Sequence, residues 1–120
     1  MSAAGKPELE FHAPQGEWHV PEGSQAQGIV QQILATDPVS GSYTRLLRFE
    51  PGADSSPNGV QLHDFWEEVY IVSGDITDLR LNERFTAGMY ACRPPGMEHG
   101  PWSSEQGVLM IEFRTMTRPT

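Results

Sequence analysis

The chain has 120 residues, which is the usual size of one domain. Eight basic and sixteen acidic residues give a formal net charge of −8 at pH 7, so the sequence lacks the basic footprint that nucleic acids or anionic membranes require. Glycine and proline supply 12 and 10 residues, or about 18% of the chain. Average proteins have roughly 12%, so the composition favours turns and short strands over long helices.

The apolar pattern and the cysteine count exclude further classes of protein. Residues 1–10 contain no apolar run, and no stretch approaches the length of about 18 apolar residues that spans a membrane. Cys92 is the only cysteine, so neither an internal disulfide nor a cysteine-based zinc site is expected. We therefore expect a cytoplasmic protein that has no signal peptide and binds neither nucleic acid nor membrane.

The N-terminal half predicts an arm followed by two strands. Residues 1–23 contain three prolines, three glycines and little periodicity, and we interpret them as an arm that packs on one domain formed by residues 24–120, with Trp18 and Val20 as anchors. Residues 27–36 could form a strand or a short helix. The strand is favoured because a hairpin turn and a second strand of period two follow directly, over residues 38–42 and 43–50.

The C-terminal half predicts four further strands. They are expected at residues 67–73, 76–81, 89–93 and 107–115, between glycine, proline and asparagine residues. Gly74 and Asp75 are interpreted as a turn between the first two of these strands. Cys92 is expected to be a small buried residue. Short strands at this spacing predict an all-β, antiparallel sandwich or barrel.

Three side chains in this half have the chemistry of metal ligands. His63 and Glu67 are four residues apart, and His99 follows 32 residues later. On one straight strand, His63 and Glu67 would lie about 13 Å apart at roughly 3.3 Å per residue, whereas a bend at residues 64–66 would bring them together. A helix would also juxtapose them, but the β-branched and aromatic residues at 69–72 argue against a helix.

The spacing of these residues resembles the two motifs of the cupin superfamily. The first motif is G-x5-H-x-H-x3–4-E-x6-G, and the chain matches it from the second histidine onward with His63, Glu67 and Gly74. The second motif is G-x5-P-x-G-x2-H-x3-N, and the chain matches it from Gly88 to His99. The resemblance covers residues 43–115. It implies a small cupin β-barrel, the double-stranded β-helix or jelly roll, built of two antiparallel sheets.

Shorter segments resemble the ChrR-type subgroup of cupins. They read LRFEPG at residues 47–52, EEVY at 67–70 and RPPG at 93–96. This subgroup includes C-terminal domains of anti-sigma factors and dioxygenases that cleave the carbon–carbon bonds of diketones. The chain departs from the superfamily motifs at three points: Gln61 replaces the first histidine, Gly52 lies eight intervening residues before Gln61 where the motif has five, and Ser103 replaces the asparagine.

The resemblance implies that His63, Glu67 and His99 hold a metal ion. Gln61 is expected either as a neutral fourth ligand or as a hydrogen-bond partner of a metal-bound water. Glu67 is preferred to Glu68 because of its spacing to Gly74. Two imidazoles and one carboxylate form the ligand set of non-haem Fe(II) oxygenases, so Fe(II) is the favoured cofactor. Zn²⁺, Mn²⁺, Ni²⁺ and Co²⁺ stay open because affinity alone does not select among them.

These residues predict a metal-dependent enzyme. The first hypothesis is a non-haem Fe(II) dioxygenase that cleaves a carbon–carbon bond in a small diketone or hydroxy-aromatic compound, with no catalytic residue beyond the metal ligands. One alternative is a non-catalytic module or sensor that binds a small molecule, and another is a metal-dependent isomerase or lyase. Arg45, Arg48 and Arg114 could each be solvated or bind an anionic substrate. A homodimer paired through sheet edges is expected.

Overall fold

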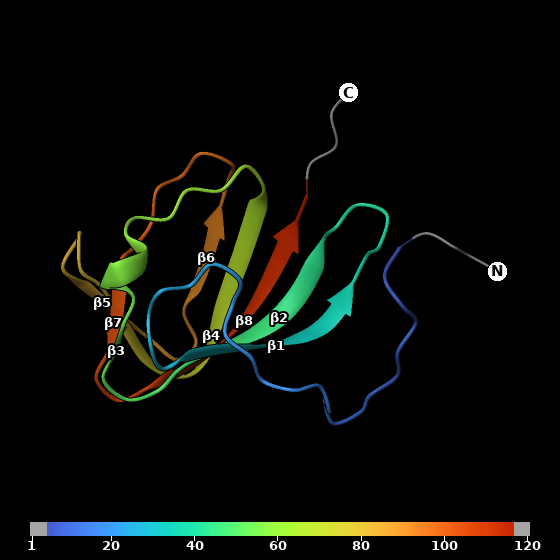
Figure 1. The fold of residues 1–120 in the computed structure, drawn as a ribbon, viewed down its shortest axis with the longest axis horizontal. Helices are drawn as coiled ribbons and strands as arrows, with labels where there is room; N and C mark the ends of the chain where they lie inside the picture. The colour runs from blue at the N-terminus through green and yellow to red at the C-terminus, as the bar shows by residue number, and fades with distance from the viewer. Residues whose placement is uncertain (1–4, 117–120) are drawn as a thin grey trace.

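The computed structural model describes residues 5–116, in which eight antiparallel strands curl into a barrel (Figure 1). This confirms the all-β fold expected from the motifs. The order of strands across the sheet is β1-β2-β8-β4-β7-β3, and β5 and β6 also pair with β4. Within the described residues, no helix is long and apolar enough to cross a membrane. The elements are β1 (Ile29–Thr36), β2 (Tyr43–Phe49), β3 (Ala53–Asp54), the 3₁₀ turn η1 (Ser56–Asn58), β4 (Trp66–Asp78), β5 (Glu83–Thr86), β6 (Tyr90–Arg93), β7 (Trp102–Ser104) and β8 (Val108–Thr115).

The longest strand, β4, shows that the turn expected at Gly74 and Asp75 was a wrong prediction. The strand continues through both residues, pairing first with β6 and β8 and then with β5 and β7. Gly74 has a φ of 84°, and an added Cβ would collide with the carbonyl oxygen of Gly107. Glycine is therefore required for a close approach of two backbones rather than for a hairpin. The turn comes later, where the Asp78 carboxylate accepts two backbone hydrogen bonds.

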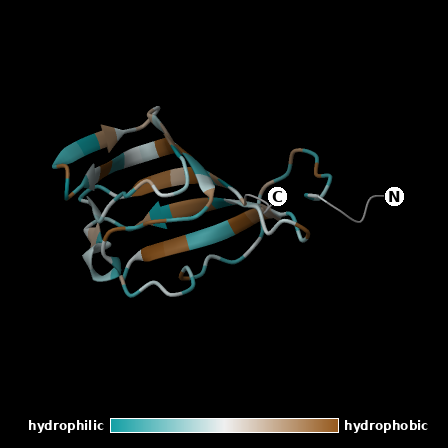
Figure 2. Ribbon diagram, turned by 90° about the horizontal axis from the view of Figure 1, so that it is seen from above, coloured by the Kyte–Doolittle hydropathy of each residue, from teal (hydrophilic) through white to brown (hydrophobic). Residues whose placement is uncertain are grey.

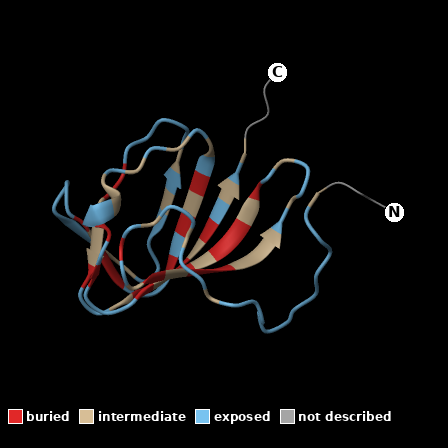
Figure 3. Cartoon of the chain, viewed as in Figure 1, coloured by how far each residue is buried: buried red, intermediate tan, exposed pale blue. Residues whose placement is uncertain are grey.

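Alternation along the strands gives the barrel an inner face with an apolar part and a charged part. Leu47, Val69 and Met110 are buried on this face, and each such side chain contributes about 1.5–3 kcal/mol on leaving water. Two residues from Leu47 and Met110 on the same strands, Arg45 and Glu112 are buried on this face as well. The strands accordingly show alternating brown and teal bands in Figure 2, and buried residues are concentrated on them in Figure 3. The candidate site lies in the charged part of the inner face.

The segment expected as an arm is exposed along most of residues 5–23 (Figure 3). It reaches the sheet at β1, where the backbones of His19 and Gln31 exchange hydrogen bonds of 2.9 and 2.8 Å. The Arg48 guanidinium lies 4.3 Å from the centre of the Trp18 ring, so Trp18 does anchor the arm. Val20 is 55% exposed, so its prediction as a second anchor was wrong. Residues 1–4 and 117–120 lie outside the described part of the chain, and the division at residue 23 stays a prediction.

Cys92 is exposed, so the expectation of a buried thiol was wrong. It lies on the outer face of β6, an edge strand whose described pairing is with β4 alone. The same outer face exposes several large apolar side chains of β4, β6 and β8, namely Trp66, Tyr70, Val72, Tyr90 and Phe113. The expected homodimer stays a prediction.

Candidate metal centre

A bend in the chain brings His63 and Glu67 together, as their spacing required. Residues 64 and 65 form the bend, and β4 begins directly after it. Nε2 of His63 lies 3.9 Å from Oε2 of Glu67, where a straight strand would separate the two residues by about 13 Å. The ring of Phe65 stacks on His63 with 4.6 Å between centroids. This stacking holds the imidazole against the start of β4.

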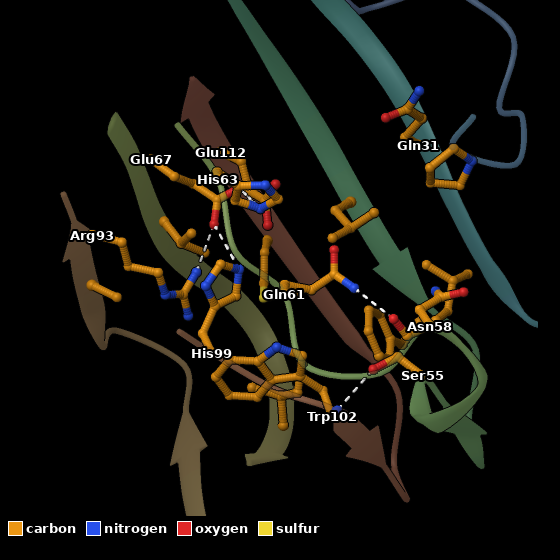
Figure 4. A pocket seen from close by; sticks show the side chains of 18 of the residues that line it. Gln31, Ser55, Asn58, Gln61, His63, Glu67, Arg93, His99, Trp102 and Glu112 are labelled. Carbon is orange, nitrogen blue, oxygen red and sulfur yellow. Dashed lines mark hydrogen bonds and ion pairs between the residues drawn. The ribbon is translucent and has the colours of Figure 1, made fainter. Parts of the chain in front are cut away.

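His99 reaches the same point from the loop between β6 and β7. Its backbone pairs with that of Gln61 through hydrogen bonds of 2.7 and 3.0 Å, so the segments that carry His63 and His99 lie side by side. Nε2 of His99 is 3.7 Å from Oε1 of Glu67, and its ring points toward that carboxylate (Figure 4). One ligand atom from each of the three residues lies within 4.8 Å of the other two. The three expected ligands therefore surround one point.

Both imidazoles are in the state that a metal ion requires. Nδ1 of His99 is 3.3 Å from the carbonyl oxygen of Met97, and donation from this nitrogen leaves the Nε2 lone pair directed at Glu67. Burial lowers the pKa of His99 to about 4, assisted by the charge of Arg93, and burial also lowers the pKa of His63. Nε2 of His63 is buried without a hydrogen-bond partner among the described residues. Coordination of an ion would satisfy this nitrogen, so the donor set fits a divalent metal.

Glu67 is 1% exposed, and two arginines hold its carboxylate. Arg93 on β6 and Arg114 on β8 are its cross-strand neighbours on either side. Nη1 of Arg93 donates to Oε1 at 2.8 Å, while Nε and Nη2 of Arg114 both lie 2.8 Å from Oε2. Burial opposes ionisation of Glu67, but the two guanidinium groups outweigh it and hold the pKa of the carboxyl below its ordinary value. The proposed ligand is therefore a carboxylate at neutral pH.

Gln61 lines the same cavity, and its amide is oriented by the backbone of η1. Nε2 of Gln61 donates to the carbonyl oxygen of Asn58 at 3.1 Å. Because a carbonyl can only accept, the amide nitrogen must lie on that side, and the amide oxygen points away from Asn58 (Figure 4). The oxygen is the atom of this side chain that can bind a cation. Whether Gln61 binds the ion or a water on it stays a prediction.

The centre lies in the wall of a cavity of about 870 Å³, a volume within the usual range for small-molecule sites. Residues 21–25, where the arm joins the domain, also line the cavity and are bound to η1 through Asn58. Oδ1 of Asn58 accepts from the N–H of Gln25 at 2.6 Å, and Nδ2 donates to Oγ of Ser24 at 3.0 Å. Seven of the ten buried core residues also line the cavity, so part of its wall is apolar: Ile29, Leu47, Phe49, Val69, Ile71, Ile76 and Met110.

The arginines of the inner face have roles that the sequence did not predict. Arg45 is buried and donates to Glu112 at 2.8 Å and to Gln31 at 2.5 Å, so it is neither solvated nor free for a substrate. Arg114 is bound to Glu67, and Arg48 lies under Trp18 on the outer face. Arg93 was not among the predicted site residues. Its position beside Glu67 depends on the pairing of β6 with β4, which the sequence did not predict.

Comparison with known proteins identifies the family. The profile of the ChrR cupin-like domain matches residues 11–117, while no curated protein matches the chain. An RmlC-like cupin from Shewanella frigidimarina superposes with a TM-score of 0.70 at 22% identity, over 94% of this chain and 95% of that chain. An acetylacetone dioxygenase from Acinetobacter johnsonii gives 0.68 at 16%, over 96% and 80%. The polyketide cyclase RemF from Streptomyces resistomycificus gives 0.73 at 15%, over 95% and 83%. These structures share the fold, and the match of the profile over most of the sequence shows that the chain belongs to the ChrR cupin-like domain family.

Proposed function

We propose that this protein is a metal-dependent enzyme, and specifically a non-haem Fe(II) dioxygenase that cleaves a carbon–carbon bond in a small diketone or hydroxy-aromatic compound. The meeting of His63, Glu67 and His99 in the wall of a cavity that is partly apolar carries the proposal. Two imidazoles and one carboxylate leave further coordination positions open, as in oxygenases with this ligand set. The structural likeness to an acetylacetone dioxygenase supports this substrate class.

Each part of the site has a role in this proposal. His63, Glu67 and His99 would hold the ion, and bound Fe(II) would supply the redox chemistry for reaction with O₂. The guanidinium groups of Arg93 and Arg114 keep Glu67 ionised and fixed in orientation. The apolar wall binds the carbon body of the substrate and excludes water from it.

The first test is the metal content of protein purified without a His-tag. The wild type is expected to contain about one ion per chain, and His99→Ala to lose it because a ligand is removed. His12→Ala is the matched control, because His12 lies exposed in the arm and its loss should leave the ion in place. The Fe(II)-loaded wild type is then tested for O₂ uptake with β-diketones and hydroxyacetophenones.

The results separate the dioxygenase from its rivals. Uptake of about one O₂ per bond cleaved would support the dioxygenase, and no uptake with any of these compounds would contradict it. Turnover with zinc or manganese under nitrogen would favour an isomerase or lyase, since that chemistry needs no oxidant. Stabilisation by a ligand without turnover would favour a binding module. Absence of any ion after reconstitution would contradict a metal-dependent enzyme of any kind.

A further inference from the structure

We propose that the centre binds its divalent ion and a small organic anion cooperatively, and that Arg93 couples the two. The inference rests on the proposed function in assuming that His63, Glu67 and His99 hold the ion. The inference is argued from the charges around Glu67 and from the hydrogen-bond donors left on Arg93. Figure 4 shows the contact between Arg93 and Glu67.

Positive charge exceeds negative charge around Glu67. Arg93 and Arg114 share this one carboxylate, so the local formal charge is about +1 before an ion binds and about +3 with a divalent ion. Glu112 lies 3.6 Å from Arg114 but forms a closer ion pair of 2.7 Å with Arg45, which neutralises it. The other buried acid of the cavity wall, Asp78, lies at the far end of β4.

This excess has a direct consequence for binding. Like charges repel strongly where water is scarce, so the two guanidinium groups disfavour a divalent ion that binds alone. An anion placed beside the ion offsets that repulsion. By reciprocity, an anion that strengthens ion binding must itself bind more tightly when the ion is present.

Arg93 has more donors available for such an anion than Arg114 has. Arg114 uses Nε and Nη2 on Glu67 and Nη1 on the hydroxyl of Tyr43. Within the described part of the chain, the bond from Nη1 to Glu67 is the only hydrogen bond made by the Arg93 guanidinium, which carries five N–H groups. The Arg93 side chain lines the cavity, is 12% exposed, and lies 5.2 Å from the centre of the Trp102 ring. Its remaining N–H groups can therefore donate to a ligand in the cavity.

The chemistry of the ligand follows from these neighbours. One of its oxygens would bind the ion, and its negative charge would accept hydrogen bonds from Arg93, whose planar fork suits a carboxylate, an enolate or a phenolate. Its carbon body would contact the apolar wall formed by residues such as Leu47, Val69 and Met110. We therefore assign the site to small oxygen anions that carry an apolar group.

The test measures ion affinity and anion affinity separately in the same variants. Co²⁺ affinity is measured by competition with a chelator in the absence of other ligands, and acetate is then titrated into the Co²⁺-loaded protein while the visible spectrum is recorded. Arg93→Gln removes the charge and is expected to bind Co²⁺ about tenfold more tightly and acetate about tenfold more weakly than the wild type. Arg93→Lys keeps the charge but loses the planar fork, so its Co²⁺ affinity should stay within about threefold of the wild type, while its acetate affinity should fall between those of the wild type and Arg93→Gln.

Two controls, together with the opposite changes expected in Co²⁺ and acetate affinity, distinguish this role of Arg93 from general damage to the site. Neutral acetamide should bind equally to wild type and Arg93→Gln, and Arg48→Gln, on the outer face, should change neither affinity. Weaker binding of both Co²⁺ and acetate in Arg93→Gln would overturn the proposal, since Arg93 would then only support Glu67. Unchanged acetate affinity would also overturn it and leave the proposed function standing. A folded wild type that binds no divalent ion would overturn both.

Discussion

Gln61 and His99 lie directly opposite each other in an isolated antiparallel bridge, joined by both pairs of backbone donors and acceptors. The bridge places position 61, where the cupin motif has a histidine, beside a proposed ligand. Gln61→His is therefore expected to tighten Zn²⁺ binding by about tenfold or more, because imidazole is a better ligand than an amide for this ion.

Competition with a chelating dye would measure the Zn²⁺ affinity of Gln61→His. Gln61→Ala should weaken binding by at most about tenfold, the usual effect of losing one outer partner or one weak ligand. An unchanged affinity in Gln61→His would show that the side chain at position 61 does not face the ion.

Metal binding should stabilise the wild type. A divalent ion at about 100 times its dissociation constant adds roughly 2.7 kcal/mol, provided that it binds only the folded chain. For a domain of this size that corresponds to a rise in Tm of about 10 °C. His63→Ala should abolish the shift, because the buried Nε2 of His63 is one of the proposed donors.

Calorimetry with and without the ion would measure these shifts. His12→Ala, which alters an exposed histidine of the arm, should keep the full shift. An equal rise in Tm for His63→Ala would place the ion elsewhere in the protein.

Loss of the Glu67 carboxylate should destabilise even the metal-free protein. Glu67→Ala leaves Arg93 and Arg114 close together without their shared partner, and breaking a buried ion pair in this way costs about 3–5 kcal/mol. Glu68 is the matched control: it accepts a hydrogen bond from the exposed Tyr90 on the outer face, so Glu68→Ala should cost less than about 1 kcal/mol. Urea unfolding in EDTA would compare the two variants. Similar decreases in the free energy of unfolding of the two variants would show that the ion pairs of Glu67 with Arg93 and Arg114 do not stabilise the metal-free protein.

The stability of the metal-free protein should fall as the pH drops below 6.5. Burial lowers the pKa of His99 to about 4 from 6.5, so on acidification the unfolded chain gains a proton before the folded chain does. The free energy of unfolding is therefore unaffected by the protonation of His99 well above pH 6.5, and it falls progressively between pH 6.5 and 4. At pH 5 the loss is on the order of 2 kcal/mol.

Urea unfolding at pH 7.5 and pH 5 would measure this loss. The lowered pKa of His63 acts in the same direction. His99→Gln should reduce the difference between the two pH values, because the variant lacks the group that titrates. If His99→Gln showed the same pH dependence as the wild type, the loss of stability at low pH would come from the titration of other groups.

Asn58 should hold the segment at residues 22–25 against η1. Asn58→Ala removes the hydrogen bonds to Ser24 and Gln25, so the amides of residues 22–25 should exchange with solvent about tenfold faster, as expected for a loss near 1.4 kcal/mol. Asn82→Gly, in the turn between β4 and β5, is the control. Hydrogen exchange measured by mass spectrometry would compare these variants. Unchanged exchange in Asn58→Ala would show that other contacts hold this segment.

The sequence predicted how His63 and Glu67 could come together because this part of the candidate site depends on local geometry. His63 and Glu67 could meet only through a bend at residues 64–66, and the strand-forming residues that follow excluded a helix; the bend is present. Alternation also predicted that Arg45 and Leu47 share one face of β2, and both line the cavity. The arrival of His99 at the same point depended on the resemblance of the motifs, since local spacing says nothing of a residue 32 positions away.

Only the tertiary structure decided the features that depend on the pairing of strands distant in the sequence. In the sequence, Gly74 looks like a turn residue. In the structure, glycine is needed there because the backbone of Gly107, just before β8, lies too close for a side chain. Cys92 was expected inside, yet no described element covers the outer face of β6. Arg93 and Arg114 flank Glu67 because β6 and β8 pair with β4 in one particular register. Register between distant strands is set by the packing of the whole inner face, and a shift of one residue would turn both arginines outward.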